Sequence, residues 1–224
     1  MKKLNPIKPI PKAEMVLWWI CRAGLLAWGI VHLFLGYTTQ FLQAVFAVIF
    51  THMWDMWQLF GGRSFIIKVP HTFQTQLNVF IFLGCVVGSS LNLHTDFTYT
   101  DILFHIFAGY LGAAFAYDFA VIVQSKKGPL SPALASMFSL AFAVMFLVGW
   151  EFYEFTMDRL YGLHLQMSNP ASEAGLIDTM TDFIYGTSGA LAGMFLTAFY
   201  RNGKLGRRSR EKFEARRAQE EETA

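Results

Sequence analysis

The fold is decided by the stretch Pro132–Met157, which reads PALASMFSLAFAVMFLVGWEFYEFTM. An α-helix needs about 20 predominantly apolar residues to cross the hydrocarbon core of a membrane. No charged residue precedes Glu151 in this stretch, so a transmembrane helix is expected here. Its far end differs in character, because Glu151 and Glu154 follow directly on the apolar part and still lie inside the helical run.

The rest of the chain is equally apolar. Its 224 residues are 54% hydrophobic, 17% aromatic and only 15% charged, which excludes an ordinary soluble domain. We expect an all-α fold, a polytopic membrane bundle of six transmembrane helices whose first two form a tight antiparallel hairpin. The six apolar runs are Glu14–Gly36, Tyr37–Trp57, Gln76–Leu93, Asp101–Val123, Pro132–Met157 and Asp178–Tyr200.

The basic residues predict the orientation of this bundle, because cytoplasmic segments of membrane proteins are enriched in Lys and Arg. With a cytoplasmic N-terminus, 16 of the 18 basic residues fall on the cytoplasmic side, eight of them from Arg201 to Arg217. We therefore expect a multi-pass inner-membrane protein with both termini in the cytoplasm. It would consist of a basic segment 1–13, a transmembrane domain 14–200 and a charged tail 201–224.

The expected partners follow from this arrangement. The basic part of the tail is expected to attract anionic headgroups of membrane lipids. Nucleic-acid binding is not expected, because these basic residues lie beside a membrane span and no binding fold accompanies them. Arg22, about two turns inside the first run, needs a counter-charge or a path to water. Asp55 and Asp118 lie at a similar depth, and an ion pair is predicted.

The acidic residues gather at one side of the expected membrane bundle. Asp101 and His105 are four residues apart and share a helix face, as do Asp178 and Asp182. Offsets of three and seven place Glu151, Glu154 and Asp158 on one stripe. The fourth and sixth helices begin on the outer side, where the fifth ends. All three acidic faces therefore lie at a similar depth and are predicted to converge.

Convergence has an energetic reason, because a carboxylate on an apolar helix surface is costly unless it faces the bundle interior, water or a counter-charge. Small residues on the fourth and sixth helices would permit close approach. They are Gly109, Gly112, Ala113, Ala114, Gly186, Gly189, Ala190 and Gly193. Carboxylates grouped in this way should bind protons or cations, which would make the stability of the protein depend on pH or on divalent ions.

Structural roles compete with a functional one at several of these positions. Asp101 and Asp178 are suited to cap their helices, and Asp158 suits a solvated surface acid beside Arg159. His105, Glu151, Glu154 and Asp182 lie inside helical runs instead of at their tips. A shared functional site is predicted for these four residues, with a purely structural hydrogen-bond network as the alternative. A structural network should tolerate Glu154→Gln, whereas a metal site should not.

The order of these motifs resembles that of a known family. The pattern Asp101-x-x-x-His105, then Gly149-Trp-Glu-x-Tyr-Glu154, then Asp178-Thr-x-x-Asp182 resembles the YjdF-like inner-membrane proteins and, more distantly, the VanZ-like superfamily. The VanZ-like pattern has Gln where this chain has Glu154, and its Arg before the acidic pair has no clear equivalent. The resemblance implies positions for a site and does not imply an activity.

Three functions are open on this sequence. The first is a metal-assisted hydrolase or transferase that acts on a lipid or cell-envelope substrate, with Glu151, Glu154 and His105 as catalytic residues. The cofactor would be a divalent metal ion. Its expected ligands are Asp101, His105, Glu151, Glu154, Asp178 and Asp182. The second is a proton- or cation-coupled transporter, although no inverted repeat or Gly/Pro-broken helix pair is present. The third is a structural or accessory membrane subunit.

Overall fold

The computed structural model describes residues 9–53, 55–56, 70–88, 98–124, 128–162, 165–166 and 173–223. Over these residues all regular structure is helical, so the predicted all-α class is confirmed there. The chain divides into two compact units, Met1–Thr100 and Asp101–Ala224.

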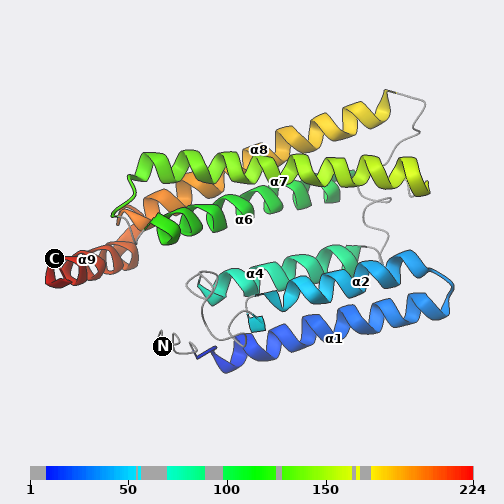
Figure 1. Ribbon diagram of the computed structural model, residues 1–224, viewed down its shortest axis with the longest axis horizontal. Helices are drawn as coiled ribbons and strands as arrows, with labels where there is room; N and C mark the ends of the chain where they lie inside the picture. Colours follow the sequence, from blue (N-terminus) through cyan, green and yellow to red (C-terminus); the bar gives the residue numbers. More distant parts are fainter. Residues whose placement is uncertain are drawn as a thin grey trace, which may run out of the picture. The chain divides into compact units, whose positions relative to one another are not determined.

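The first unit is built on a helical hairpin (Figure 1). Helix α1 (Lys12–Phe34) turns at Gly36, whose φ of 89° favours glycine, and α2 (Thr38–Thr51) returns against it. The predicted tight hairpin is therefore confirmed. Helix α4 (His71–Phe82) packs on this pair and continues into the π-helical segment η2, Leu83–Gly88.

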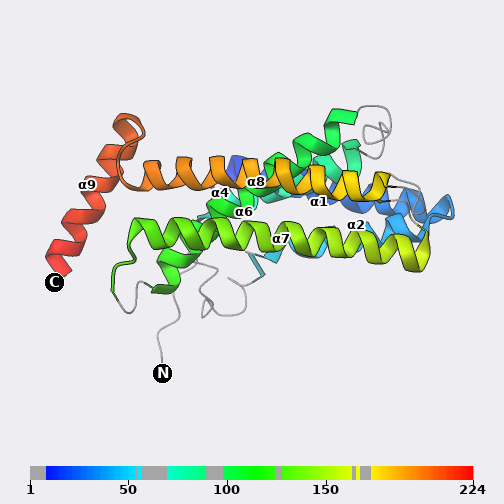
Figure 2. The same ribbon diagram turned by 90° about the horizontal axis from the view of Figure 1, so that it is seen from above.

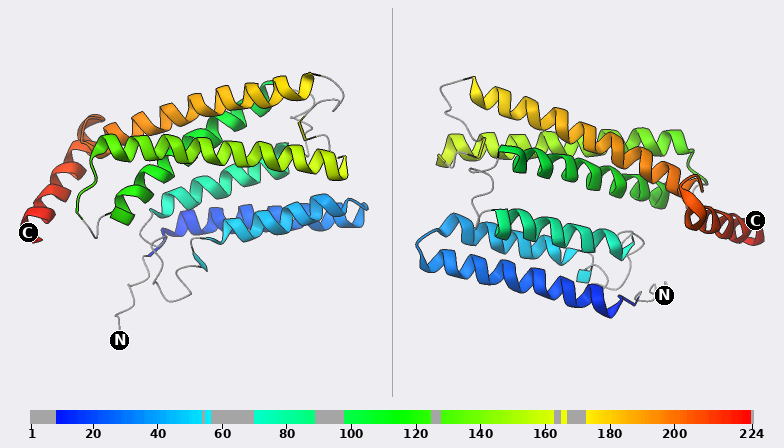
Figure 3. Two further views of the ribbon diagram at one scale, coloured as in Figure 1. Left: turned by 45° about the horizontal axis from the view of Figure 1, so that its top comes forward. Right: turned by 180° about the vertical axis from the view of Figure 1, so that it is seen from behind.

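The second unit contains three long helices that run alongside one another and a fourth that leaves them at an angle (Figures 2 and 3). They are α6 (Thr98–Gln124), α7 (Pro132–Tyr161), α8 (Ala174–Arg201) and α9 (Gly206–Thr223). The Ser131 side chain accepts a hydrogen bond from the N–H of Leu134 at the start of α7. Gly162, with φ 63°, ends that helix.

Four helices of the described part are long and apolar enough to cross a membrane. They are Lys12–Phe34, Tyr99–Gln124, Pro132–Tyr161 and Ala174–Arg201. Helix α2 is apolar but shorter, and the third expected span consists of the 12-residue α4 and the six-residue η2. A membrane-type helical bundle is thus supported, whereas six crossings and the orientation of the termini stay predictions.

Several predicted boundaries differ from the observed ones. The second helix was expected to reach Trp57, but α2 ends at Thr51. The third was expected to begin at Gln76, and α4 begins at His71, directly after Pro70. The sixth was expected to begin at Asp178, but α8 begins at Ala174. The charged tail forms the helix α9, and the expected end of the third helix lies outside the described residues.

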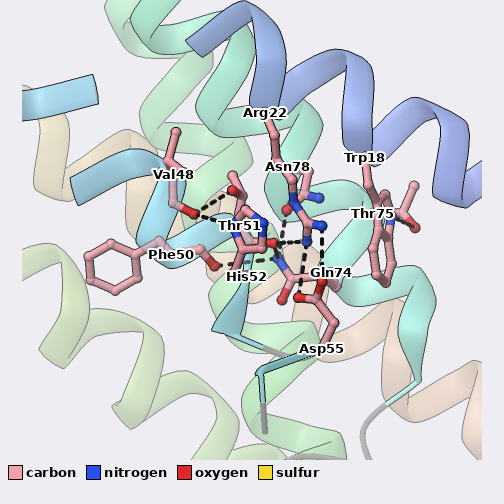
Figure 4. Close-up of polar contacts among 10 residues, drawn as sticks. All are labelled: Trp18, Arg22, Val48, Phe50, Thr51, His52, Asp55, Gln74, Thr75 and Asn78. Atoms are coloured by element: carbon pink, nitrogen blue, oxygen red, sulfur yellow. Dashed lines mark hydrogen bonds and ion pairs between the residues drawn. The ribbon is translucent and has the colours of Figure 1, made fainter. Parts of the chain in front are cut away.

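The early end of α2 has a physical cause in a buried polar cluster around Arg22 (Figure 4). The guanidinium donates two hydrogen bonds, of 2.9 and 3.0 Å, to the carboxylate of Asp55, and a third to the carbonyl of Thr51. Gln74 donates to the same carbonyl at 3.1 Å. The side chains of α1 and α4 therefore satisfy the last carbonyls of α2, which have no partner within that helix.

This cluster settles the predicted ion pair. Arg22 is 4% exposed and pairs with Asp55, which is one of the two acids predicted to lie at its depth. Its guanidinium also lies 5.3 Å from the ring centroid of Trp18 and 5.5 Å from that of Trp19. Asp118 pairs with Arg201 in the second unit instead.

Close backbone contact between α6 and α8 organises the second unit. A Cβ atom added to Gly109 would overlap the carbonyl oxygen of Gly186. One added to Gly189 or Gly193 would overlap the backbone of α6 at Ile106 or Tyr110. The predicted close approach at these small residues is therefore confirmed. Helix α7 joins them through Ser139, which donates to the carbonyl of Ala113 at 2.7 Å.

Replacing Arg22 by Met is expected to destabilise the protein by about 3 kcal/mol, because the carboxylate of Asp55 and the end of α2 lose their shared partner. The measurement is thermal unfolding in detergent. The matched control is Arg207→Met, which breaks the Arg207–Glu211 pair on the surface of α9. That pair is solvent-exposed and should contribute little. Equal melting temperatures for both variants would contradict the role given to Arg22.

Gly189→Ala is expected to lower stability by about 1–3 kcal/mol, because the new methyl group meets the backbone of α6 and forces the two helices apart. Gly149→Ala provides the control. A Cβ atom at Gly149 meets nothing within 4 Å, and alanine is the better helix former. Thermal unfolding of the two variants should therefore differ in sign, and a stabilised Gly189→Ala protein would show that the contact is not tight.

Candidate metal centre

One face of α7 changes from small and apolar to acidic along its length. Its buried residues recur every three or four positions and therefore form a single stripe. They are Ala135, Ser139, Ala143, Leu147, Glu151, Glu154 and Asp158. The face that packs against the other helices near Ala143 thus carries three carboxylates in the turns beyond Leu147.

Two groups of three side chains bring atoms suited to metal binding together. Asp101, His105 and Asp182 form the first triad, and Glu151, Glu154 and Asp182 form the second. In each triad one nitrogen or oxygen atom of every residue lies within 4.8 Å of the others. Asp182 belongs to both triads, and we call the five residues the Asp182 cluster. Asp101 is half-buried, and the other four are buried.

The distances around His105 suit a cation between ligands. Its Nε2 atom lies 3.7 Å from an oxygen of Asp101 and 3.6 Å from an oxygen of Asp182. Both distances exceed those of a normal N–H···O hydrogen bond, about 2.7–3.2 Å. Two ligands on one tetrahedral ion with bonds of about 2.1 Å are about 3.4 Å apart. The separation of His105 from each of the two carboxylates is therefore close to that of two ligands on one metal ion.

Outer hydrogen bonds orient the two glutamates. Thr179 donates to Oε2 of Glu151 at 2.8 Å, and Gln166 donates to the Thr179 hydroxyl at 3.0 Å. Trp150 donates its indole N–H to Oε1 of Glu154 at 2.7 Å. The other oxygen of Glu151, Oε1, is buried and has no hydrogen-bond partner in the described part of the chain. A buried acceptor of this kind is costly unless a proton or cation occupies it.

Comparison with known proteins agrees with a membrane location. A family model described as "Predicted membrane protein (DUF2238)" matches residues 14–203. The chain belongs to this family. It is also 25% identical over 120 residues to an "Uncharacterized protein" of Thermotoga maritima, which covers 53% of this chain and 57% of that protein. The match thus spans little more than half of this relative, and no solved structure matches the chain.

These comparisons confirm a membrane protein family, which is the coarser part of the predicted resemblance. The YjdF-like and VanZ-like names do not occur in them, so that finer resemblance stays a prediction. The family description gives no activity or ligand.

Two structural roles predicted for acids of this site are wrong. Asp158 was expected to be a solvated surface acid, but it is 8% exposed and accepts the backbone N–H groups of Leu165 and Gln166 at 2.6 and 3.0 Å. It fixes the chain that leaves α7. Asp178 was expected to cap the sixth helix, but Glu173 holds that position. Asp178 is half-buried one turn before Asp182 and is in neither triad.

Three residues of the site were missed from sequence. Trp150 precedes Glu154 by four positions. Side chains at this spacing lie together on a helix, so the sequence could have indicated the hydrogen bond between them. Thr179 stands beside Asp178 on the same helix but contacts Glu151 on another helix, which no local spacing predicts. Gln166 lies in the connection after α7 and carries no sequence signal for its hydrogen bond to Thr179.

If the Asp182 cluster holds a divalent ion, Thr179→Val is expected to weaken its binding about 10–100-fold, the usual cost of removing an outer hydrogen-bond partner of a metal ligand. The substitution keeps the side-chain shape and removes the hydroxyl that orients Glu151. Isothermal titration of Mn²⁺ or Zn²⁺ into purified protein gives the affinity. Thr181→Val is the matched control on the same helix, because the described structure shows no hydrogen bond from Thr181. An equal effect of both changes would remove Thr179 from the site.

Proposed function

We propose that the protein is an integral membrane enzyme that binds a divalent cation at the Asp182 cluster and hydrolyses or transfers a group on a lipid or cell-envelope substrate. The observation that carries this proposal is the pair of ligand triads that share Asp182. They combine residues from α6, α7 and α8, and most of their side chains are buried among those helices.

Charge supports the binding of a cation. The cluster contains four carboxylic acids and one histidine, so even a protonated His105 would leave it with excess negative charge when the acids are ionised. Burial makes such an excess expensive. Protons or bound cations remove it. The composition of the two triads favours a cation, because each one supplies three ligand-type atoms in close range.

The ligand types indicate which cation would bind. A triad of one histidine and two carboxylates suits borderline ions such as Zn²⁺, Fe²⁺ or Mn²⁺, and a triad of three carboxylates suits the harder Mg²⁺, Mn²⁺ or Ca²⁺. Mn²⁺ is compatible with both. Asp182 belongs to both triads and would be a ligand in either case.

Glu154 is the residue best suited to act as the general base. One of its oxygens is held by the indole N–H of Trp150, which fixes the direction of the carboxylate. In a hydrolysis, Glu154 accepts a proton from the attacking water, and the water oxygen bonds to the electrophilic carbon or phosphorus. The bond to the leaving oxygen breaks, and the proton returns to that oxygen. A divalent cation held by the Asp182 cluster would supply Lewis-acid stabilisation of the charge that develops on the substrate oxygen.

The proposed location follows from charge. We retain the model of six spans in an inner membrane with both termini in the cytoplasm, supported by the 16 basic residues that this arrangement gathers on one side. Arg201 and α9 lie at one end of α8, and Asp182 lies near the other. The Asp182 cluster would then open toward the outer leaflet. The motif order behind the YjdF-like and VanZ-like resemblance runs through the same residues.

Elemental analysis of the purified protein tests the proposal. The wild-type protein is expected to contain at least one divalent metal ion per chain. His105→Ala and Glu151→Gln should each reduce this content, because each removes a ligand-type atom from one triad. Glu211→Gln is the matched control, since it removes a carboxylate from the exposed surface of α9.

Two results of this metal analysis would overturn the proposal. Absence of metal from every sample would overturn the proposal, and so would a metal content that is unchanged in His105→Ala and Glu151→Gln after dialysis against a chelator and reloading, because the metal would then be bound outside the Asp182 cluster. An inductively coupled plasma measurement on folded, monodisperse protein separates this result from simple loss of the fold.

A further inference from the structure

Helix α9 is fixed to the end of α8 by contacts along one of its faces. The buried hydroxyl of Ser209 donates to the carbonyl of Tyr200 at 2.6 Å, and Arg216 donates to the carbonyl of Arg201 at 2.6 Å. The Nζ atom of Lys212 lies 5.6 Å from the ring centroid of Tyr200. We call the side chains that contact α8 or the turn after it the docked face. They are Ser209, Lys212, Phe213 and Arg216.

The joint between α8 and α9 is also tied to the rest of the second unit. Arg201 pairs with the carboxylate of Asp118 on α6, with an Nε–Oδ1 distance of 2.7 Å. Helix α8 is long and apolar enough to cross a membrane, and it ends at Arg201. Figure 2 shows that α9 leaves the axis of α8 at an angle. The docked face of α9 is therefore the face that points back toward the membrane surface at which α8 ends.

Charge is distributed unevenly around α9. An α-helix turns by about 100° per residue, so Arg208 and Arg210 each lie about 100° from Ser209, on opposite flanks of the docked face. Both side chains are exposed. The acids within residues 206–218 are Glu211 and Glu214, and they lie about 140–160° from Ser209. The helix thus carries exposed positive charge beside its docked face and its negative charge on the far side.

We infer that α9 binds the headgroups of anionic phospholipids at the membrane surface where α8 ends, through the basic side chains that flank the docked face. An attraction of this kind was expected for the whole basic tail, and here it belongs to one face of a docked helix. The surface is separate from the Asp182 cluster, because Asp182 lies near the other end of α8. It does not depend on the proposed metal ion.

Charge complementarity favours this occupant. A guanidinium group matches the geometry of a phosphate and can donate two parallel hydrogen bonds to it. Anionic lipids also give the membrane surface a negative potential that attracts basic segments beside a membrane span. A zwitterionic headgroup carries a positive charge of its own, which removes most of that attraction. The expected partner is therefore a lipid with net negative charge, such as phosphatidylglycerol.

Two neighbouring arginines differ in the face that they occupy. Arg207 lies on the far side of α9, where its Nε atom is 2.7 Å from a carboxylate oxygen of Glu211. Arg208 follows it in the chain and lies on a flank of the docked face. Replacing either one by glutamine removes the same charge from the protein. The pair therefore separates an effect of the face from an effect of net charge.

The test uses the full-length protein in nanodiscs of phosphatidylcholine with a trace of phosphatidylglycerol that carries a photoactivatable group on its headgroup. Mass spectrometry gives the labelling of α9 relative to that by a phosphatidylcholine probe with the same group. One basic residue near an anionic surface changes binding about fivefold. We expect the wild type to prefer phosphatidylglycerol by at least about fivefold. This preference should fall about fivefold in Arg208→Gln and persist in Arg207→Gln and Arg208→Lys.

Several results would overturn the inference. Equal labelling of the wild type by the two probes would mean that α9 meets only bulk lipid. An equal loss in Arg207→Gln and Arg208→Gln would reflect the net charge of the tail and no particular face. An undiminished preference in Arg208→Gln, or a loss in Arg208→Lys, would show that the charge at this flank does not hold the headgroup. Melting temperatures equal to that of the wild type exclude unfolding as the cause of a change.

Discussion

The contact between the backbones of α6 and α8 fixes most of what the second unit can do. Gly109, Gly186, Gly189 and Gly193 have no side chains to hold the two helices apart, and at three of these points one helix lies against a carbonyl of the other. Packing of this kind is the main source of helix association inside a membrane, where burial of apolar surface gives little advantage. It also sets the distance between the side chains that project one turn beyond the glycines, which are His105 and Asp182.

Helix α7 completes the arrangement by changing character along a single face. Toward its first half, Ser139 and Ala143 let it lie close to α6. In its second half the same stripe presents Glu151 and Glu154 to the other two helices. The residues that pack and the residues that form the Asp182 cluster are therefore continuous along one face. A change in helix packing near Ala143 would be transmitted to the carboxylates through a stiff helix instead of through loops.

Helical periodicity explains which parts could be predicted from sequence. The hairpin of α1 and α2 followed from the short connection at Gly36–Thr39, and the acidic helix faces and the small-residue face at Gly189 followed from spacing within single helices. The end of α2 could not be predicted, because side chains from α1 and α4 terminate it. Asp158 and Gln166 were misjudged or missed for a related reason. Their hydrogen bonds involve the connection after α7, and its backbone path is not encoded in a periodic pattern.

Two polar clusters among the described residues, around Arg22 and around Asp182, differ in their charge balance. Around Arg22, one positive charge meets one negative charge, and Arg22 and Gln74 both donate to the carbonyl of Thr51, so the cluster is neutral within the described residues, with only Nε of Arg22 lacking a hydrogen-bond partner there. Around Asp182, four acids share one histidine, and a buried oxygen of Glu151 has no partner in the described residues. A stabilising network has no reason to retain an excess of like charge in a region where charge is expensive. The imbalance is explained if the missing positive charge comes from outside the chain, as in the proposed binding of a divalent cation.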